Sequence, residues 1–248
     1  GPNVRANVKA GYADYLPVHL RESQALYRSG CIKLGAALVN ISRPDKEGKV
    51  SLGTSVDCSV AAIETADVVI GVMNPHVPFS HGDLVSLDQF DYLVEDDTPL
   101  VTAGFAEPTP TEVLIGKNCA ALVDDGDCIQ MGIGALPNAL AGQLGSHKNL
   151  GLHTEMFADG LLRLIKAGVI NGACKKIDTG KVVASFLLGS QEVYSFIDDN
   201  PAVLMKDIKY TNDPWVIAQN PHMKSINSAV EVDLTGQVVA DSIGQRIF

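Results

Sequence analysis

The sequence of 248 residues is poor in cysteine and lacks any long apolar run. Its five cysteines lie far apart without a C-x-x-C pair, which argues against a disulfide scaffold and predicts free thiols. No stretch approaches the roughly 20 apolar residues that cross a bilayer, and no basic segment precedes an apolar one as in a signal peptide. We therefore expect no membrane partner and a cytoplasmic protein, or a mitochondrial one in a eukaryote.

Basic residues are also scarce, because 19 Lys and Arg stand against 29 Asp and Glu, for a net charge of −10. Duplex binding draws mainly on Lys and Arg contacts to phosphate, so we expect no nucleic-acid partner. With 46% hydrophobic and 19% charged residues, the chain can bury a sizeable core and leaves apolar surface that needs covering. This composition favours a homodimer or a higher homo-oligomer.

Strand and helix patterns alternate along the chain and predict an α/β fold. Residues 36–41 and 68–73 are apolar runs typical of parallel strands covered on both faces, and residues 55–66 between them have helical spacing. This order predicts a right-handed βαβ unit. Two prolines mark residues 107–111 as a linker.

We therefore expect two open α/β modules, residues 1–106 and 111–248, with mostly parallel sheets and helices on both faces. The chain begins with Gly1 instead of an initiator Met and ends without a tail-like signal, so we expect a piece of a longer protein in which both modules are incomplete.

The second module is organised around a glycine-rich turn followed by a carboxylate. An apolar strand at 127–131 leads into the turn, a short helix is expected at 137–144, and Glu155 follows another apolar segment. Towards the end of the chain, the alternation that starts at Ser225 predicts a hairpin with its turn at 235–236.

The turn itself, G-I-G-A-L-P, allows two interpretations. Pro137 stands where a dinucleotide-binding loop has its third glycine, so the pattern fits a simple tight turn from strand to helix. It also fits a ligand loop, in which Gly132 and Gly134 let the backbone approach a ligand closely and offer N–H groups at a helix N-terminus.

Glu155 likewise has two interpretations. A carboxylate among apolar neighbours is costly unless it is paired or used chemically, which favours a functional role. The alternative is a glutamate at the start of a helix, and His153 beside it is read as a partly buried polar residue. In the first module His76, His81 and Asp83 match no familiar metal-site spacing, so we expect no metal.

Longer motifs carry a family resemblance. G-I-G-A-L-P at 132–137, G-L-H-T-E-M-F-A-D-G at 151–160 and S-I-N-S-A-V-E-V-D-L-T-G-Q-V at 225–238 together resemble the acetyl-CoA hydrolase/transferase family, which includes acetate, butyrate and 4-hydroxybutyrate CoA-transferases. The resemblance extends over nearly the whole chain. It departs from the family pattern at 42–48 and 74–78, where S-P-P-D-x-H-G and N-x-Q-x-P are usual.

The resemblance implies two similar open α/β halves with the site between them and Glu155 as the covalent nucleophile. It implies a CoA-contacting loop made of Gly132, Ile133, Gly134, Ala135 and Leu136. Coenzyme A and acyl-CoA would enter as substrates, with no permanently bound cofactor. The family's C-terminal part, with a second CoA-contacting loop, is expected to lie outside this chain.

The activity implied is transfer of CoA from a short-chain acyl-CoA to a carboxylic acid such as acetate, butyrate or 4-hydroxybutyrate, through a glutamyl-CoA thioester. An acyl-CoA hydrolase and a non-catalytic CoA-binding module are the alternatives.

Overall fold

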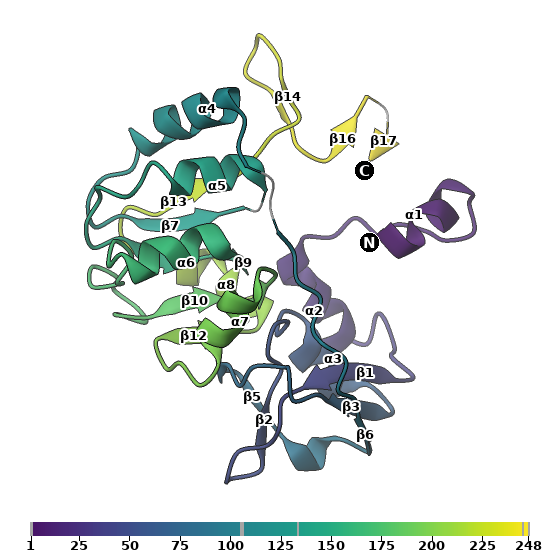
Figure 1. The fold of residues 1–248 in the computed structure, drawn as a ribbon. Helices are drawn as coiled ribbons and strands as arrows, with labels where there is room; N and C mark the ends of the chain where they lie inside the picture. The colour runs from purple at the N-terminus through teal and green to yellow at the C-terminus, as the bar shows by residue number, and fades with distance from the viewer. Residues whose placement is uncertain (1, 105–106, 133, 245, 248) are drawn as a thin grey trace.

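Two parallel sheets organise the chain in a computed structural model that describes residues 2–104, 107–132, 134–244 and 246–247 (Figure 1). The first sheet has the order β1-β3-β6, and α3 connects β1 to β3, which confirms the βαβ unit. The elements of this part are α1 (Pro2–Lys9), α2 (Leu20–Arg28), β1 (Ala37–Ile41), β2 (Lys49–Ser51), α3 (Ser59–Thr65), β3 (Val69–Met73), β4 (His81–Gly82), β5 (Leu84–Ser86), the 3-10 helix η1 (Leu87–Gln89) and β6 (Tyr92–Glu95).

The second sheet has the order β13-β7-β8-β10-β12-β4, with every neighbouring pair parallel. Its elements and those that follow are α4 (Pro110–Ala120), β7 (Cys128–Met131), α5 (Ala135–Ala141), β8 (Gly151–His153), β9 (Met156–Phe157), α6 (Asp159–Lys166), β10 (Val182–Ala184), β11 (Phe186–Leu187), α7 (Gln191–Ile197), β12 (Val203–Met205), α8 (Ile208–Thr211), α9 (Pro214–Ile217), β13 (Lys224–Ile226), β14 (Glu231–Val232), β15 (Val238–Val239), β16 (Ser242–Ile243) and β17 (Arg246–Ile247).

The strand order of the second sheet reverses beside β7. From β7 the chain moves through β8 and β10 to β12, and then returns to place β13 on the other side of β7. Right-handed crossovers therefore put α5, α6 and α7 on one face of the sheet and the returning α8 and α9 on the other. In open parallel sheets such a reversal opens a crevice at the carboxyl ends of the strands, here those of β7 and β13.

Apolar side chains on successive strands form the core of this sheet. Ile129, Leu152, Val183 and Met205, on β7, β8, β10 and β12, are all fully buried. Each comes from a short apolar run, as a parallel strand covered on both faces requires. This packing fixes the carboxyl ends of the strands, where the site is built.

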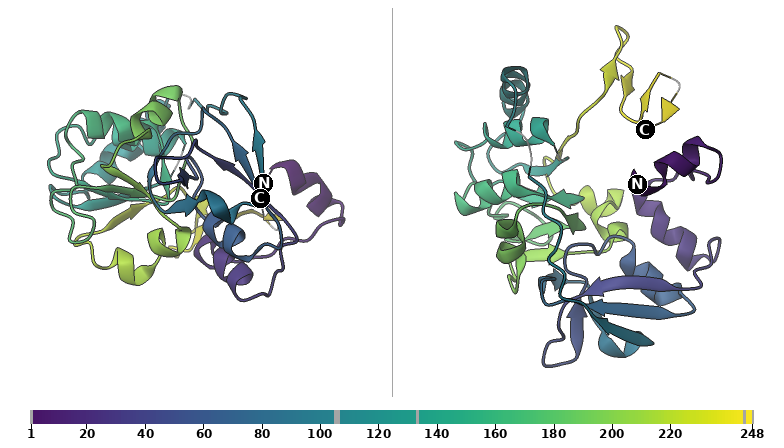
Figure 2. Two further views of the ribbon diagram at one scale, coloured as in Figure 1. Left: turned by 90° about the horizontal axis from the view of Figure 1, so that it is seen from below. Right: turned by 45° about the vertical axis from the view of Figure 1, so that its right-hand side comes forward.

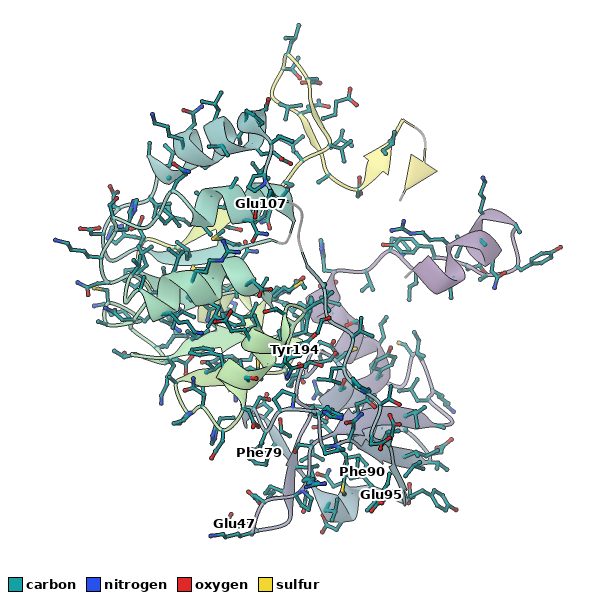
Figure 3. The ribbon with its side chains drawn as sticks, viewed as in Figure 1. Glu47, Phe79, Phe90, Glu95, Glu107 and Tyr194 are labelled. Atoms are coloured by element: carbon teal, nitrogen blue, oxygen red, sulfur yellow. The ribbon has the colours of Figure 1, made fainter. Side chains whose placement is uncertain are left out.

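The two parts of the chain are joined by more than the linker. Strand β4 pairs with β12, so residues from before the linker add an edge to the second sheet. The Tyr194 hydroxyl on α7 donates to the Val101 carbonyl at 2.6 Å, which holds the segment after β6 against the second part (Figure 3). By contrast, α1 and the strands β14 to β17 extend away from both sheets (Figures 1 and 2).

Two expectations for the second module need correction. Helix α5 begins at Ala135 and not at Pro137, and it ends at Ala141. The hairpin comprises only β14 and β15, around the expected turn, whereas Ile226 belongs to β13, which pairs in parallel with β7. Among the described residues, no helix is both long and apolar enough to cross a bilayer.

Candidate active site

Glu155 lies at a bend between β8 and β9, at the carboxyl end of β8. Its backbone carbonyl accepts hydrogen bonds from the N–H groups of Ser185, at 3.0 Å, and Phe186, at 3.2 Å. These bonds fix the bend because β10 is interrupted at the same level. The alternative of a helix-start glutamate is wrong, since the next helix, α6, begins only at Asp159.

The carboxylate of Glu155 is held by an amide. The Nδ2 of Asn212 donates to its Oε2 at 2.5 Å, a short hydrogen bond to a carboxylate oxygen. Asn212 follows the last residue of α8, and Asp213 next to it caps α9 through the N–H groups of Trp215 and Val216. The local sequence Asn212-Asp213-Pro214 is typical of a helix start, but nothing in it indicates the contact with Glu155.

The expected CoA loop follows β7 and is only partly open. The Gly132 N–H donates to the Ile226 carbonyl at 3.1 Å, so the free donor expected at Gly132 is wrong for this arrangement. Gly134 has φ of +114° and precedes α5, and a Cβ added there would meet nothing within 4 Å. Ala135 and Leu136 form the start of α5. Ile133 lies outside the described residues.

Two cavities meet at Glu155. The first, of about 500 Å³, opens at the crevice between β7 and β13 and is lined by Gln130, Met131, Gly132, Glu155, Met156, Phe186, Asn212, Ile217, Ser225 and Asn227. The second, of about 460 Å³, lies against the start of α2 and is lined by His19, Leu20, Arg21, Glu22, Glu155, Asn212 and Pro214. Glu155 and Asn212 line both, so the carboxylate is accessible from two sides.

Polar side chains at the end of β13 face the first cavity. The Gln130 Oε1 accepts from the Ser225 hydroxyl at 2.6 Å and from the Asn227 Nδ2 at 3.1 Å, and the Gln130 Nε2 donates back to the Asn227 Oδ1 at 3.2 Å. These hydrogen bonds link the side chain on β7 to those on β13 and just after it. The cavity is thus lined by these polar side chains together with the apolar residues Met156 and Phe186.

Burial disfavours the thiol of Cys128 as an alternative nucleophile, and Cys128 lines neither cavity. Cys128 on β7 is buried, which raises the pKa of its thiol to about 11. The thiol stays protonated at neutral pH and is a poor nucleophile. The carboxylate of Glu155, which lines two cavities, is therefore the better candidate.

Two of the three residues weighed as metal ligands, His81 and Asp83, have other partners. His81 Nε2 lies 3.0 Å from Asp199 Oδ1, and Asp83 accepts from the Lys206 ammonium and, at 2.7 Å, from the Asp207 N–H. Across the described ranges no three His, Cys, Asp or Glu side chains cluster as metal ligands would.

Sequence comparison relates both ends of the chain to one family. Residues 1–103 match the acetyl-CoA hydrolase/transferase N-terminal domain, and residues 189–248 match the C-terminal domain of the same family. The chain is 42% identical to a succinyl-CoA:acetate/propanoyl-CoA:succinate CoA transferase of Fasciola hepatica, over 100% of this chain and 52% of that protein. It is also 42% identical to a 4-hydroxybutyrate coenzyme A transferase of Clostridium kluyveri, over 99% of this chain and 58% of the relative.

Solved structures agree with these matches. The 4-hydroxybutyrate CoA-transferase of Porphyromonas gingivalis superposes with a TM-score of 0.86 at 39% identity, covering 96% of this chain and 61% of that one. RipA from Yersinia pestis gives 0.89 at 33% identity, covering 96% and 56%. The chain spans little more than half the length of the two curated relatives. Both in sequence and in fold, it belongs to the acetyl-CoA hydrolase/transferase family.

Proposed function

We propose that the protein carrying this chain transfers coenzyme A between a short-chain acyl-CoA and a carboxylic acid, with Glu155 as the covalent nucleophile. The observation that carries the proposal is that the Glu155 carboxylate lines two cavities at once, one at the glycine loop and one at the start of α2. A ping-pong transferase needs one carboxylate that meets a thioester and a free acid in turn. The relatives named above are CoA-transferases of acetate, succinate or 4-hydroxybutyrate type.

The first half-reaction would run in two steps. A Glu155 oxygen attacks the acyl carbonyl, the C–S bond breaks, and CoA leaves as a thiolate from an acyl-glutamyl anhydride. The thiolate then attacks the glutamyl carbonyl and releases the acyl group as a carboxylate, which leaves a glutamyl-CoA thioester. A second carboxylic acid reverses these steps. An ordinary carboxylate is a weak nucleophile, so attack requires the acyl-CoA to be held at near-attack distance.

Donors to the developing oxyanions come from two places. The Asn212 amide already lies against Glu155, and an oxyanion on the glutamyl carbon would form beside it. On the loop we assign CoA contacts to Gly132, Ile133, Gly134, Ala135 and Leu136, with Gly134 as the point of closest backbone approach. Removing one well-placed donor typically costs about 3 to 4 kcal/mol of barrier.

A hydrolase would differ only in letting water resolve the glutamyl thioester. Measuring acyl-CoA consumption with and without added acetate separates the two activities. We expect consumption to depend on acetate and a new acyl-CoA to appear. Loss of the thioester at a rate indifferent to acetate would replace the transferase by the hydrolase.

A non-catalytic CoA-binding module is the candidate from another class. Calorimetry with CoA distinguishes it, because binding without turnover in the full-length protein would favour this reading and turnover would exclude it. For residues 1–248 alone we expect weak activity or none.

We further propose that no cofactor is permanently bound and that the two modules are residues 1–106 and 111–248.

We also propose a homo-oligomer. The register aligns Leu38, Ile70 and Tyr92 across the first sheet, and Leu38 and Tyr92 are 71% and 63% exposed. Parallel sheets are ordinarily covered on both faces, so this face is suited to a second copy. Light scattering that gives a monomer at micromolar concentration would contradict the assembly. We also propose that the protein is located in the cytoplasm, or in the mitochondrion of a eukaryote.

A further inference from the structure

His153 and Glu155 both attach to the end of α8. His153 Nε2 lies 2.7 Å from the Thr211 carbonyl oxygen, and because a carbonyl only accepts, Nε2 carries the proton. Two residues further along, Glu155 Oε2 accepts from Asn212 Nδ2 at 2.5 Å. Residues 153 and 155 of one segment thus bind residues 211 and 212 of another, which forms a closed ring of contacts.

We propose that His153 is a positioning residue that holds Asn212 in place against the Glu155 carboxylate. This inference rests on the proposed function, because the position of Asn212 matters for turnover only if Glu155 is the nucleophile. His153 itself is buried and lines neither cavity. His153 acts through the backbone of Thr211 and so is not itself a catalytic residue.

The burial of His153 shows what the imidazole contributes at this position. The side chain is 1% exposed, and within the described residues its Nδ1 is a buried atom without a hydrogen-bond partner. An unsatisfied buried acceptor destabilises the fold, and an apolar side chain of similar size would fill the space without that cost. The bond from Nε2 to Thr211 is therefore what the imidazole supplies and an apolar residue cannot. Burial also lowers the pKa of His153, which keeps the ring neutral.

The helix that carries Asn212 needs an external anchor. Helix α8 has four residues, from Ile208 to Thr211, and a single turn has little stability of its own. At its start Asp207 accepts from the Lys209 N–H at 2.7 Å. At its end the last carbonyls lack helical partners, and the bond from His153 satisfies that of Thr211. Helix α8 is also held at its start, where the Ile208 N–H donates to the Asp57 carbonyl at 2.9 Å, so the bond from His153 is the contact that ties its Asn212 end to β8.

The test compares three variants in the full-length protein. His153→Met removes both ring nitrogens, whereas His153→Gln has the same chain length and keeps an N–H donor. His147→Met is the control, because His147 Nε2 also bonds a backbone carbonyl, that of Val123 at 2.9 Å, but in the connection from α5 that leads to the amino end of β8, whereas Glu155 follows its carboxyl end. Each change is made alone and with Asn212→Ala, and kcat and the KM for acyl-CoA are measured.

We expect His153→Met to lower kcat at least about 10-fold with little change in KM, because displacing a reacting group by about 1 Å can cost 100-fold. His153→Gln should restore most of the loss. In the Asn212→Ala background, His153→Met should lower kcat by less than a further factor of two. His147→Met should instead change kcat by the same factor in both backgrounds.

The outcomes separate this inference from the proposed function. A wild-type protein without acyl-CoA turnover would refute the function itself. An active wild type in which His153→Met and Asn212→Ala multiply independently, or in which His153→Gln is as slow as His153→Met, would refute the positioning role. The thermal unfolding of every variant is measured as well, so that loss of folded protein can be excluded as the cause of a lower kcat. If His153→Met does not fold, the kcat values of His153→Gln, alone and combined with Asn212→Ala, still decide whether the two residues act together.

Discussion

Shortening the nucleophile by one methylene is the most informative perturbation of the site. In Glu155→Asp the carboxylate retreats by about 1.3 Å, so the 2.5 Å bond from Asn212 lengthens to about 3.8 Å, outside hydrogen-bonding range. The attacking oxygen moves by the same amount, and a displacement of this size can cost about 100-fold in rate. A 100-fold loss corresponds to about 2.7 kcal/mol of barrier. We therefore expect Glu155→Asp to retain about 1% of wild-type turnover.

Glu155→Gln is the matched substitution, because its amide oxygen can still accept from Asn212 while the amide cannot form an anhydride. We expect unchanged thermal stability and CoA affinity with turnover lost. Borohydride added after acyl-CoA should reduce the glutamyl thioester of the wild type to an alcohol, found by peptide mass at Glu155. A fully active Glu155→Gln, or a mass shift at Cys128 instead, would refute the mechanism.

Four further predictions concern the site and the packing of the fold around it. Asn212→Ala should lower kcat by about 100- to 1000-fold with CoA affinity unchanged, because it removes a donor at the oxyanion. Equal losses of binding and turnover in titration and initial-rate data would contradict this. Burial lowers the pKa of His153 below the 6.5 of an unfolded chain, so only the unfolded state binds the proton as the pH falls below about 6.5. Stability should therefore drop over that window by up to about 1.4 kcal/mol per pH unit, and urea titrations should show a weaker pH dependence for His153→Gln. Gly82→Ala should destabilise the fold by about 2 kcal/mol or more in urea, since φ is +121° and a Cβ would lie 2.1 Å from the Met205 carbonyl oxygen. Arg28→Met should cost about 1 to 2 kcal/mol, because Asp207 loses a partner at 2.9 Å, and a melting temperature equal to wild type would count against that ion pair.

Local patterns predicted the strands and the site loop well. Apolar runs placed β1, β3 and β7, because buried parallel strands contain little else. The glycines predicted a turn between β7 and α5, and in the structure Gly134 of this turn has a positive φ. The carboxylate among apolar neighbours singled out Glu155, although the residues alone could not separate a nucleophile from a helix start.

The rest depends on contacts distant in the sequence. Asn212 lies 57 residues after Glu155, and no local feature distinguishes an amide that caps a helix from one that binds a carboxylate. Strand β4 has two residues, too few for any periodicity, and its place beside β12 is decided by pairing. The alternation around Ile226 fits a hairpin as well as an edge strand, and only the free edge of β7 decides between them.

The same turn of the chain creates the crevice and supplies its key amide. To reverse the strand order, the connection from β12 to β13 must cross the face of the sheet that α5, α6 and α7 leave open. His153 on β8 and Glu155 at the bend after it bond to Thr211 and Asn212 of that connection, so this is the face it crosses. Asn212 is thus brought to Glu155 by topology, and the bond from His153 sets its final position. Substitutions along α8 and α9 should consequently alter turnover even where they touch neither cavity.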